Sequence, residues 1–180
     1  MATKASVYIA ASLDGYIARS DGSLDWLLSL TTPDDHDSFA QFMANIDAVV
    51  MGRGTFETVL AMGEWPFAGK RVVVLSTTLS TQDIPAPLRD AVELHAGPPA
   101  SLVQHLAAVG SPRLYVDGGK TIRSFLREGL IDEITINHVP VLLGSGIPLF
   151  GDLPADIKLR HMATQTFAVG FVRSRYEVVR

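Results

Sequence analysis

Short runs of β-branched and other apolar residues recur along the chain and are separated by segments long enough to form helices. These runs occupy residues 6–11, 48–52, 71–75, 113–117 and 131–139. Continuous apolar runs of this length are typical of strands buried on both faces of a mostly parallel sheet. Because such runs alternate with helix-sized segments, the pattern predicts an α/β fold around a central, mostly parallel sheet.

Four of the intervening segments are predicted to be helices: residues 34–45, 55–62, 101–109 and 121–128. In the first of them apolar side chains recur at the spacing that places them on one helix face. Each of the other three is followed by a glycine, namely Gly63, Gly110 and Gly129. Glycine is favoured just past a helix C-terminus because it readily adopts positive φ.

The end of the chain has a different pattern. Residues 158–167 and 171–180 resemble strands, and the three residues between them suit a tight reversal, which predicts a C-terminal antiparallel hairpin. No internal repeat, low-complexity tract or linker-like stretch interrupts the sequence. We therefore expect one domain that spans residues 1–180.

Composition narrows the class of protein. Of the 180 residues 47% are hydrophobic, which is enough for a core, yet no run has the ~20 apolar residues that a membrane helix needs. The first residues lack the pattern of a signal peptide, so the expected location is the cytoplasm. The chain has no cysteine, which excludes disulfides, thiolate metal ligands and a cysteine nucleophile.

Charge and histidine spacing argue against two classes of ligand. The formal net charge is −4 and the fifteen Lys and Arg residues are scattered, so no basic face is predicted for nucleic acid. A small anion remains compatible, because helix N-termini and a few local cations can bind phosphate. The histidines outside the first predicted helix lack the spacing of a zinc site, so no metal is predicted.

The first motif with chemical content is the turn from Met51 to Thr55, which follows a predicted strand and begins a helix. Gly52 lets the backbone approach a ligand, Arg53 can fork onto phosphate oxygens, and Thr55 offers a hydroxyl beside the helix N–H groups. The alternative is a tight turn in which Thr55 caps the helix and Arg53 lies in solvent.

A second glycine turn, with Gly118, Gly119, Lys120 and Thr121, follows another predicted strand and again begins a helix. Together the two turns can bind the two ends of a pyrophosphate at the carboxyl edge of an open sheet, and the alternative is a pair of purely structural turns.

A third candidate is the group of hydroxyls at Ser76, Thr77 and Thr78, which end a strand and can contact a ribose or its phosphate. Taken alone, these hydroxyls favour a purely structural interpretation, because serine and threonine end many strands.

These motifs resemble those of a known family. VVMGRGTF (residues 49–56), residues 75–77 and VDGGK (residues 116–120) are similar, in order and spacing, to segments of the dihydrofolate-reductase-like family. AASLDGYIA (residues 10–18) and residues 114–150 resemble one branch more closely. That branch contains the reductase domain of the riboflavin-biosynthesis deaminase/reductase and its stand-alone bacterial relatives, and the resemblance spans nearly the whole chain.

The resemblance implies a three-layer α/β/α fold, a homodimer and NADPH as cofactor. It implies pyrophosphate contacts at Gly52, Arg53, Thr55, Gly118, Gly119 and Thr121. It implies contacts to the adenosine 2′-phosphate at Ser76, Thr77 and Lys120. It implies that the nicotinamide is flanked by Ala10, Ala11 and Ile17.

Substrate and proton-donor candidates follow from the same comparison. The acidic residue that dihydrofolate reductases use to protonate the pterin falls at or near His36, between Asp35 and Asp37; His36 is a candidate proton donor or a surface residue. The riboflavin enzymes usually have Glu where this chain has Asp117, which orients a substrate hydroxyl or caps a helix. Asp14 is expected near the substrate or in an Asx-type turn, and Trp26 stacks on a flat ring or fills the core.

The resulting expectation is an NADPH-dependent reductase of a small nitrogen heterocycle, with 5-amino-6-(5-phosphoribosylamino)uracil as the best-matching substrate. A dihydrofolate or other pterin reductase is the alternative within the same chemistry. From another class, the alternatives are a non-catalytic NADPH-binding regulatory protein and a purely structural α/β protein. The apolar terminal hairpin and the PVLLG segment (residues 140–144) offer a surface for the expected homodimer.

Overall fold

A computed structural model describes residues 3–29 and 33–180, and within this part the side chains of residues 33–36 are not described. The strands are β1 (Lys4–Ser12), β2 (Tyr16–Ala18), β3 (Ala48–Gly52), β4 (Arg71–Leu75), β5 (Val92–His95), β6 (Arg113–Asp117), β7 (Glu133–Val139), β8 (Ile147–Pro148), β9 (Leu159–Thr166) and β10 (Val172–Val178). The α-helices are α1 (Asp25–Leu28), α2 (Pro33–Ala44), α3 (Arg53–Ala61), α4 (Pro99–Ala108) and α5 (Gly119–Arg127). Two short 3₁₀ turns, Thr81–Asp83 and Ala86–Leu88, lie between β4 and β5.

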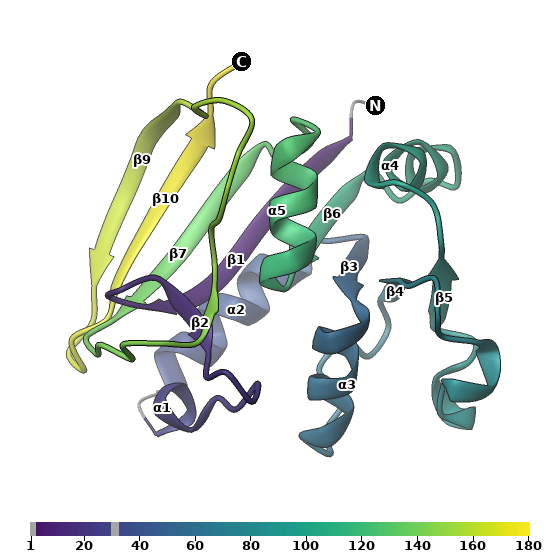
Figure 1. The fold of residues 1–180 in the computed structure, drawn as a ribbon, viewed down its shortest axis with the longest axis horizontal. Helices are drawn as coiled ribbons and strands as arrows, with labels where there is room; N and C mark the ends of the chain where they lie inside the picture. The colour runs from purple at the N-terminus through teal and green to yellow at the C-terminus, as the bar shows by residue number, and fades with distance from the viewer. Residues whose placement is uncertain (1–2, 30–32) are drawn as a thin grey trace.

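Eight of the described strands form one sheet in the order β5-β4-β3-β6-β1-β7-β10-β9, which crosses the molecule in Figure 1. The strands from β5 to β7 pair in parallel, and β10 pairs antiparallel with both β7 and β9. Strands β3, β4 and β6 are buried over most of their length, because the sheet is covered on both faces there. The predicted mostly parallel sheet and C-terminal hairpin are both confirmed.

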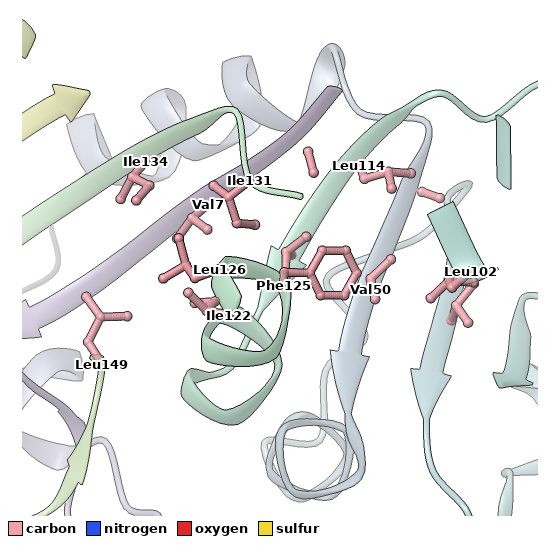
Figure 2. Packing of buried hydrophobic residues seen from close by; sticks show 14 of the residues in the cluster. Val7, Val50, Leu102, Leu114, Ile122, Phe125, Leu126, Ile131, Ile134 and Leu149 are labelled. Carbon is pink, nitrogen blue, oxygen red and sulfur yellow. The ribbon is translucent and has the colours of Figure 1, made fainter. Parts of the chain in front are cut away.

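Helices cover the sheet on two sides and produce three layers, as the resemblance implied (Figure 1). On one side α4 and α5 pack on the sheet, and Figure 2 shows Ile122, Phe125 and Leu126 of α5 among the buried side chains of the strands. Phe125 is fully buried, and removing a side chain of this size from water contributes ~2–3 kcal/mol. On the other side α2 and α3 contribute Met43 and Phe56 to a second cluster.

The chain reverses and ends its helices where the sequence predicted glycine. Gly63, Gly110 and Gly129, which follow α3, α4 and α5, have φ of 80°, 78° and 64°. Gly170 has φ of 91° between β9 and β10. These values lie in the left-handed region, which glycine adopts at little cost. Within the described residues, no helix combines the length and apolar composition required to cross a bilayer.

Candidate functional site

The carboxyl ends of several neighbouring strands open onto one cavity of about 1530 Å³. Its lining includes Ala10 of β1, Gly52 of β3, Leu75 of β4, Asp117 of β6 and Asn137 of β7. Parallel strands all end at the same edge of the sheet, which is where open α/β sheets bind ligands. Since sites for drug-sized ligands measure ~300–1,000 Å³, this cavity has room for a dinucleotide and a second small molecule.

The two glycine turns pack directly against each other. Strands β3 and β6 are neighbours, with Met51 opposite Asp117, so the turns that follow them meet. A Cβ on Gly52 would lie 3.0 Å from Oγ1 of Thr121, and a Cβ on Gly118 would overlap the side chain of Thr55. Gly118 therefore leaves no room for a side chain beside Thr55, Gly52 fits closely against Thr121, and this packing holds the N-termini of α3 and α5 side by side.

Both of these helix N-termini are available to an anion. Gly52 and Gly118 occupy the N-cap positions and provide no capping side chain, and neither α3 nor α5 has an acidic residue in its first turn. The first N–H groups of a helix lack partners within the helix, and the helix dipole adds partial positive charge. Two such ends beside each other suit a doubly charged pyrophosphate.

Hydroxyl groups and one cation gather at the end of β4. Ser76 Oγ accepts hydrogen bonds from the N–H groups of Thr78 (3.2 Å) and Leu79 (3.0 Å), which fixes the turn. Arg53 donates from Nη1 to Oγ1 of Thr78 at 3.1 Å and from Nε to Glu57 at 2.7 Å. The guanidinium of Arg53 thus extends from the β3 turn toward the β4 turn.

The cavity is lined by almost all of the residues that the sequence predicted for the cofactor: Ala10, Ile17, Gly52, Arg53, Thr55, Ser76, Thr77, Gly118, Gly119, Lys120 and Thr121. The exception is Ala11, which is 2% exposed and belongs to the core between α5 and the sheet. Successive side chains of a strand point to opposite faces, so Ala10 and Ala11 cannot both face the cavity. A Cβ on Gly119 would lie 3.0 Å from Cδ1 of Ile17, which places the β2 strand beside the second glycine turn.

Asp117 is half-buried and lines the same cavity at the end of β6. Its Oδ1 accepts a hydrogen bond from the Gly118 N–H at 2.8 Å. Burial raises the pKa of Asp117 from 3.8 to about 6, although hydrogen bonds from Gly118 and Tyr115 oppose the shift. A carboxyl group with this pKa retains a proton in a useful fraction of molecules near neutral pH, as acid catalysts require.

The cavity has aromatic walls beyond Asp117, from Tyr8, Phe39, Tyr115 and Phe171. Two polar side chains that sequence reasoning missed, Asn137 and Arg173, also line it there. Arg173 Nε donates to Oδ1 of Asn137 at 2.6 Å, across the pairing of β7 and β10. The available sequence indication was an amide inside the buried run ITINHV (residues 134–139), since a buried polar residue is unusual.

Two of the predicted substrate residues, Asp14 and Trp26, are not among the residues that line the cavity. Asp14 is exposed, and its carboxylate accepts hydrogen bonds from Ser12 Oγ (2.6 Å) and from the N–H groups of Leu143 (3.1 Å) and Gly144 (2.7 Å). It thereby joins the turn after β1 to the segment after β7. Trp26 is 5% exposed and belongs to a core cluster with Val139 and Phe171, which matches the core alternative.

The third predicted substrate residue, His36, lies in α2, and its side chain is outside the part of the chain that the structure describes. Among the described residues, no group of three His, Asp or Glu side chains is arranged to hold a metal ion.

Comparison with known proteins gives matches over nearly the whole chain. A family model for the RibD C-terminal domain matches residues 4–173. A solved structure from Shewanella sp. PV-4, of a protein whose name refers to riboflavin biosynthesis, is 40% identical with a TM-score of 0.91, and the match covers 98% of this chain and 99% of that one. The uncharacterized protein YwjB of Bacillus subtilis (strain 168) is 35% identical over 93% of this chain and 94% of its own length. The Thermotoga maritima diaminohydroxyphosphoribosylaminopyrimidine deaminase/5-amino-6-(5-phosphoribosylamino)uracil reductase shares the fold at 17% identity, with a TM-score of 0.71 over 99% of this chain and 57% of that one.

Proposed function

This chain belongs to the RibD C-terminal domain family, and on that premise we propose that it is an NADPH-dependent reductase of a small, planar nitrogen heterocycle. The proposed reaction resembles that of a 5-amino-6-(5-phosphoribosylamino)uracil reductase in riboflavin biosynthesis. The observation that carries the proposal is the pair of interlocked glycine turns, which presents two uncapped helix N-termini to one large cavity.

The residues around the cavity fit the parts of NADPH in order. The N-termini of α3 and α5 suit the pyrophosphate, because neither has a capping side chain or an acidic residue in its first turn, and of these N–H groups that of Gly118 is shared with Asp117. Arg53, with the hydroxyls of Ser76 and Thr77, supports recognition of the adenosine 2′-phosphate and so favours NADPH over NADH. The small or apolar side chains of Ala10 and Ile17 leave space for the nicotinamide ring, which supplies hydride when the cofactor is bound.

Reduction of a C=N or C=O bond also requires a proton on the heteroatom, and Asp117 is the proposed source. Its carboxyl lines the cavity and has its pKa raised to about 6 by burial, so it is partly protonated near neutral pH. Positioned acids of this kind contribute ~10²–10⁴-fold to rate. The aromatic side chains of Tyr8 and Phe39 in the cavity lining are suited to a flat ring.

The proposal is tested by titration of the purified protein with NADPH and, separately, with NADH, followed through the fluorescence of Trp26 and Trp65. Oxidation of NADPH is then measured in the presence of candidate pyrimidines and pterins, together with the amount of product. We expect preferential binding of NADPH and one product molecule for each NADPH oxidised. Asp117→Asn should keep the binding and lose most of the turnover.

Two results would count against the reductase. Tight NADPH binding without oxidation by any pyrimidine or pterin would favour the regulatory alternative, in which the phosphate sites serve as a sensor. Failure of both nucleotides to bind would remove the cofactor and the reductase together. Oxidation with a pterin and not with a pyrimidine would retain the enzyme class and change its substrate.

We also propose that the chain forms a homodimer, as the resemblance implies. Strand β9 lies at the edge of the sheet and is exposed along its whole length, with Leu159 and Met162 among its exposed apolar side chains. An exposed sheet edge favours association because its backbone N–H and C=O groups lack partners. Analytical ultracentrifugation at micromolar concentration tests this, and a purely monomeric protein would exclude the dimer.

A further inference from the structure

Asn137 is a buried polar residue that lines the cavity. It is 7% exposed and lies on β7, where its register partners are Ala10 of β1 and Arg173 of β10. Ala10 is the position that the proposed function places beside the nicotinamide. The side chain of Asn137 therefore lies one strand away from the site proposed for hydride transfer, on the face of the sheet that lines the cavity.

The orientation of the Asn137 amide follows from its contact with Arg173. A guanidinium has donors and no acceptor, so the atom that meets Arg173 Nε at 2.6 Å must be the amide oxygen. The Arg173 guanidinium is itself packed between two rings, 4.6 Å from the centroid of Phe167 and 5.3 Å from that of Tyr8. With Oδ1 fixed toward Arg173, the NH₂ group of Asn137 faces the other way.

This NH₂ group donates no hydrogen bond to any residue in the described ranges 3–29 and 33–180. Its nitrogen also differs from the fully buried polar atoms that have no hydrogen-bond partner, because it keeps some contact with solvent. The donor is therefore unpaired within the described chain and accessible from the cavity. Leaving a donor unsatisfied in a mostly buried position costs ~1–3 kcal/mol, so an acceptor that enters the cavity gains from pairing with it.

The surroundings specify which acceptor fits. Tyr8 and Phe39 contribute aromatic side chains to the lining of the cavity, which favours a flat ring. A carbonyl oxygen in the plane of such a ring is an acceptor for a fixed amide NH₂ group. The Asp117 carboxyl lines the same cavity, and in its protonated form it supplies a second donor to the ring.

We propose that Asn137 is a specificity-determining residue that selects flat heterocycles with a ring carbonyl, as in pyrimidinones and pteridinones, and orients them toward the nicotinamide. This inference rests on the proposed reductase function, which it refines by naming the residue that selects the substrate. A site that donates a hydrogen bond to its ligand rejects an analogue without the acceptor far more strongly than an apolar pocket would. Arg173 acts as a positioning residue, since it holds the amide in the required orientation.

The test compares quinazoline-2,4-dione with quinazoline, two flat bicycles that differ in their ring carbonyls. Each is titrated calorimetrically into the full chain, with and without NADP⁺. Asn137→Asp retains an acceptor for Arg173 and loses the NH₂ donor, and Thr135→Val changes a buried polar residue on the same face of β7 as a matched control. The NADPH affinity of each variant is measured in parallel.

We expect the wild type to bind the dione at least about tenfold more tightly than quinazoline, and Asn137→Asp to lower dione affinity by about tenfold or more. Quinazoline affinity and NADPH affinity should change by less than about twofold in both variants, and Thr135→Val should bind the dione as the wild type does. Equal binding of the two bicycles, no dione binding, or dione binding unaffected by Asn137→Asp would each overturn the inference. Loss of NADPH binding by the wild type would instead overturn the proposed function.

Discussion

The side chain of Thr55 occupies the space that a Cβ on Gly118 would need. Gly118 also has φ of 87°, which other residues adopt only with strain. Gly118→Ala should therefore lower the free energy of unfolding by about 1–3 kcal/mol and weaken NADPH binding, because the two turns must separate to admit the methyl group. Urea denaturation and fluorescence titration measure the two effects.

Gly54→Ala is the matched control, since a Cβ at Gly54 would meet nothing within 4 Å and its backbone is helical. Its free energy of unfolding should stay within about 0.5 kcal/mol of the wild type or rise slightly, because alanine favours a helix more than glycine does. If Gly118→Ala were as stable as Gly54→Ala, the two turns would not be packed as described.

The contact of Arg53 with Thr78 brings its guanidinium toward the site proposed for the adenosine 2′-phosphate. At that site Arg53 would favour NADPH over NADH. Arg53→Ala should weaken NADPH binding by about tenfold or more and change NADH binding by less than about twofold, because NADH lacks the phosphate. Arg53→Lys, which keeps the charge and loses the fork, should give an intermediate loss. Equal weakening of both nucleotides would instead place Arg53 at the pyrophosphate.

The sequence predicted the central elements because their signals are local. Strands β3, β4 and β6 are buried on both faces, so their residues are continuously apolar and recognisable. Strand β5 was missed because it is short and lies at the sheet edge, where polar residues are tolerated. Strands β2 and β8 have three and two residues and pair only with each other, so only the tertiary structure defines them.

The candidate site divides in the same way. The glycine turns could be predicted because each lies within one short segment that follows a strand. The contact between Asn137 and Arg173 could not, because it depends on the register of β7 with β10. Ala11 was grouped with Ala10 because the resemblance gave the segment and not the face of the strand, and Trp26 has a burial that only packing reveals.

Asp14 should stabilise the segment after β7 rather than bind substrate. Asp14→Ala should increase hydrogen exchange at the Leu143 and Gly144 amides by about tenfold at neutral pH, since both lose a carboxylate acceptor. NADPH affinity should be unchanged. Asp83→Ala removes a carboxylate with local partners elsewhere and should leave these two amides as they are.

Acid should reproduce part of the Asp14→Ala effect. The hydrogen bond from Ser12, followed by those from Gly144 and Leu143, lowers the pKa of Asp14, although partial burial opposes them. A group with a lowered folded pKa stabilises the folded state above its unfolded pKa and loses this effect as the pH falls through the folded pKa. Protection of the two amides should thus persist through mild acid. Loss of protection already near neutral pH would contradict the assigned contact.

Asp117 gives the sharpest pH dependence, in two independent measurements. If its protonated form donates the proton, kcat/KM should decline as the pH rises through about 6, and Asp117→Asn should lose ~10²–10⁴-fold in rate together with that limb of the profile.

The free energy of unfolding should also decline as the pH rises. Burial raises the pKa from 3.8 to about 6, so the folded state binds the proton more tightly, and stability falls between these two pH values as the carboxyl ionises. Asp117→Asn should therefore match the wild type in free energy of unfolding near pH 3.5 and exceed it at pH 8, by at most about 3 kcal/mol, because solvent in the cavity screens part of the charge. A rate limb near pH 6 without the stability difference would assign the limb to another group, and the stability difference without the limb would leave Asp117 buried in the cavity without a role in proton transfer.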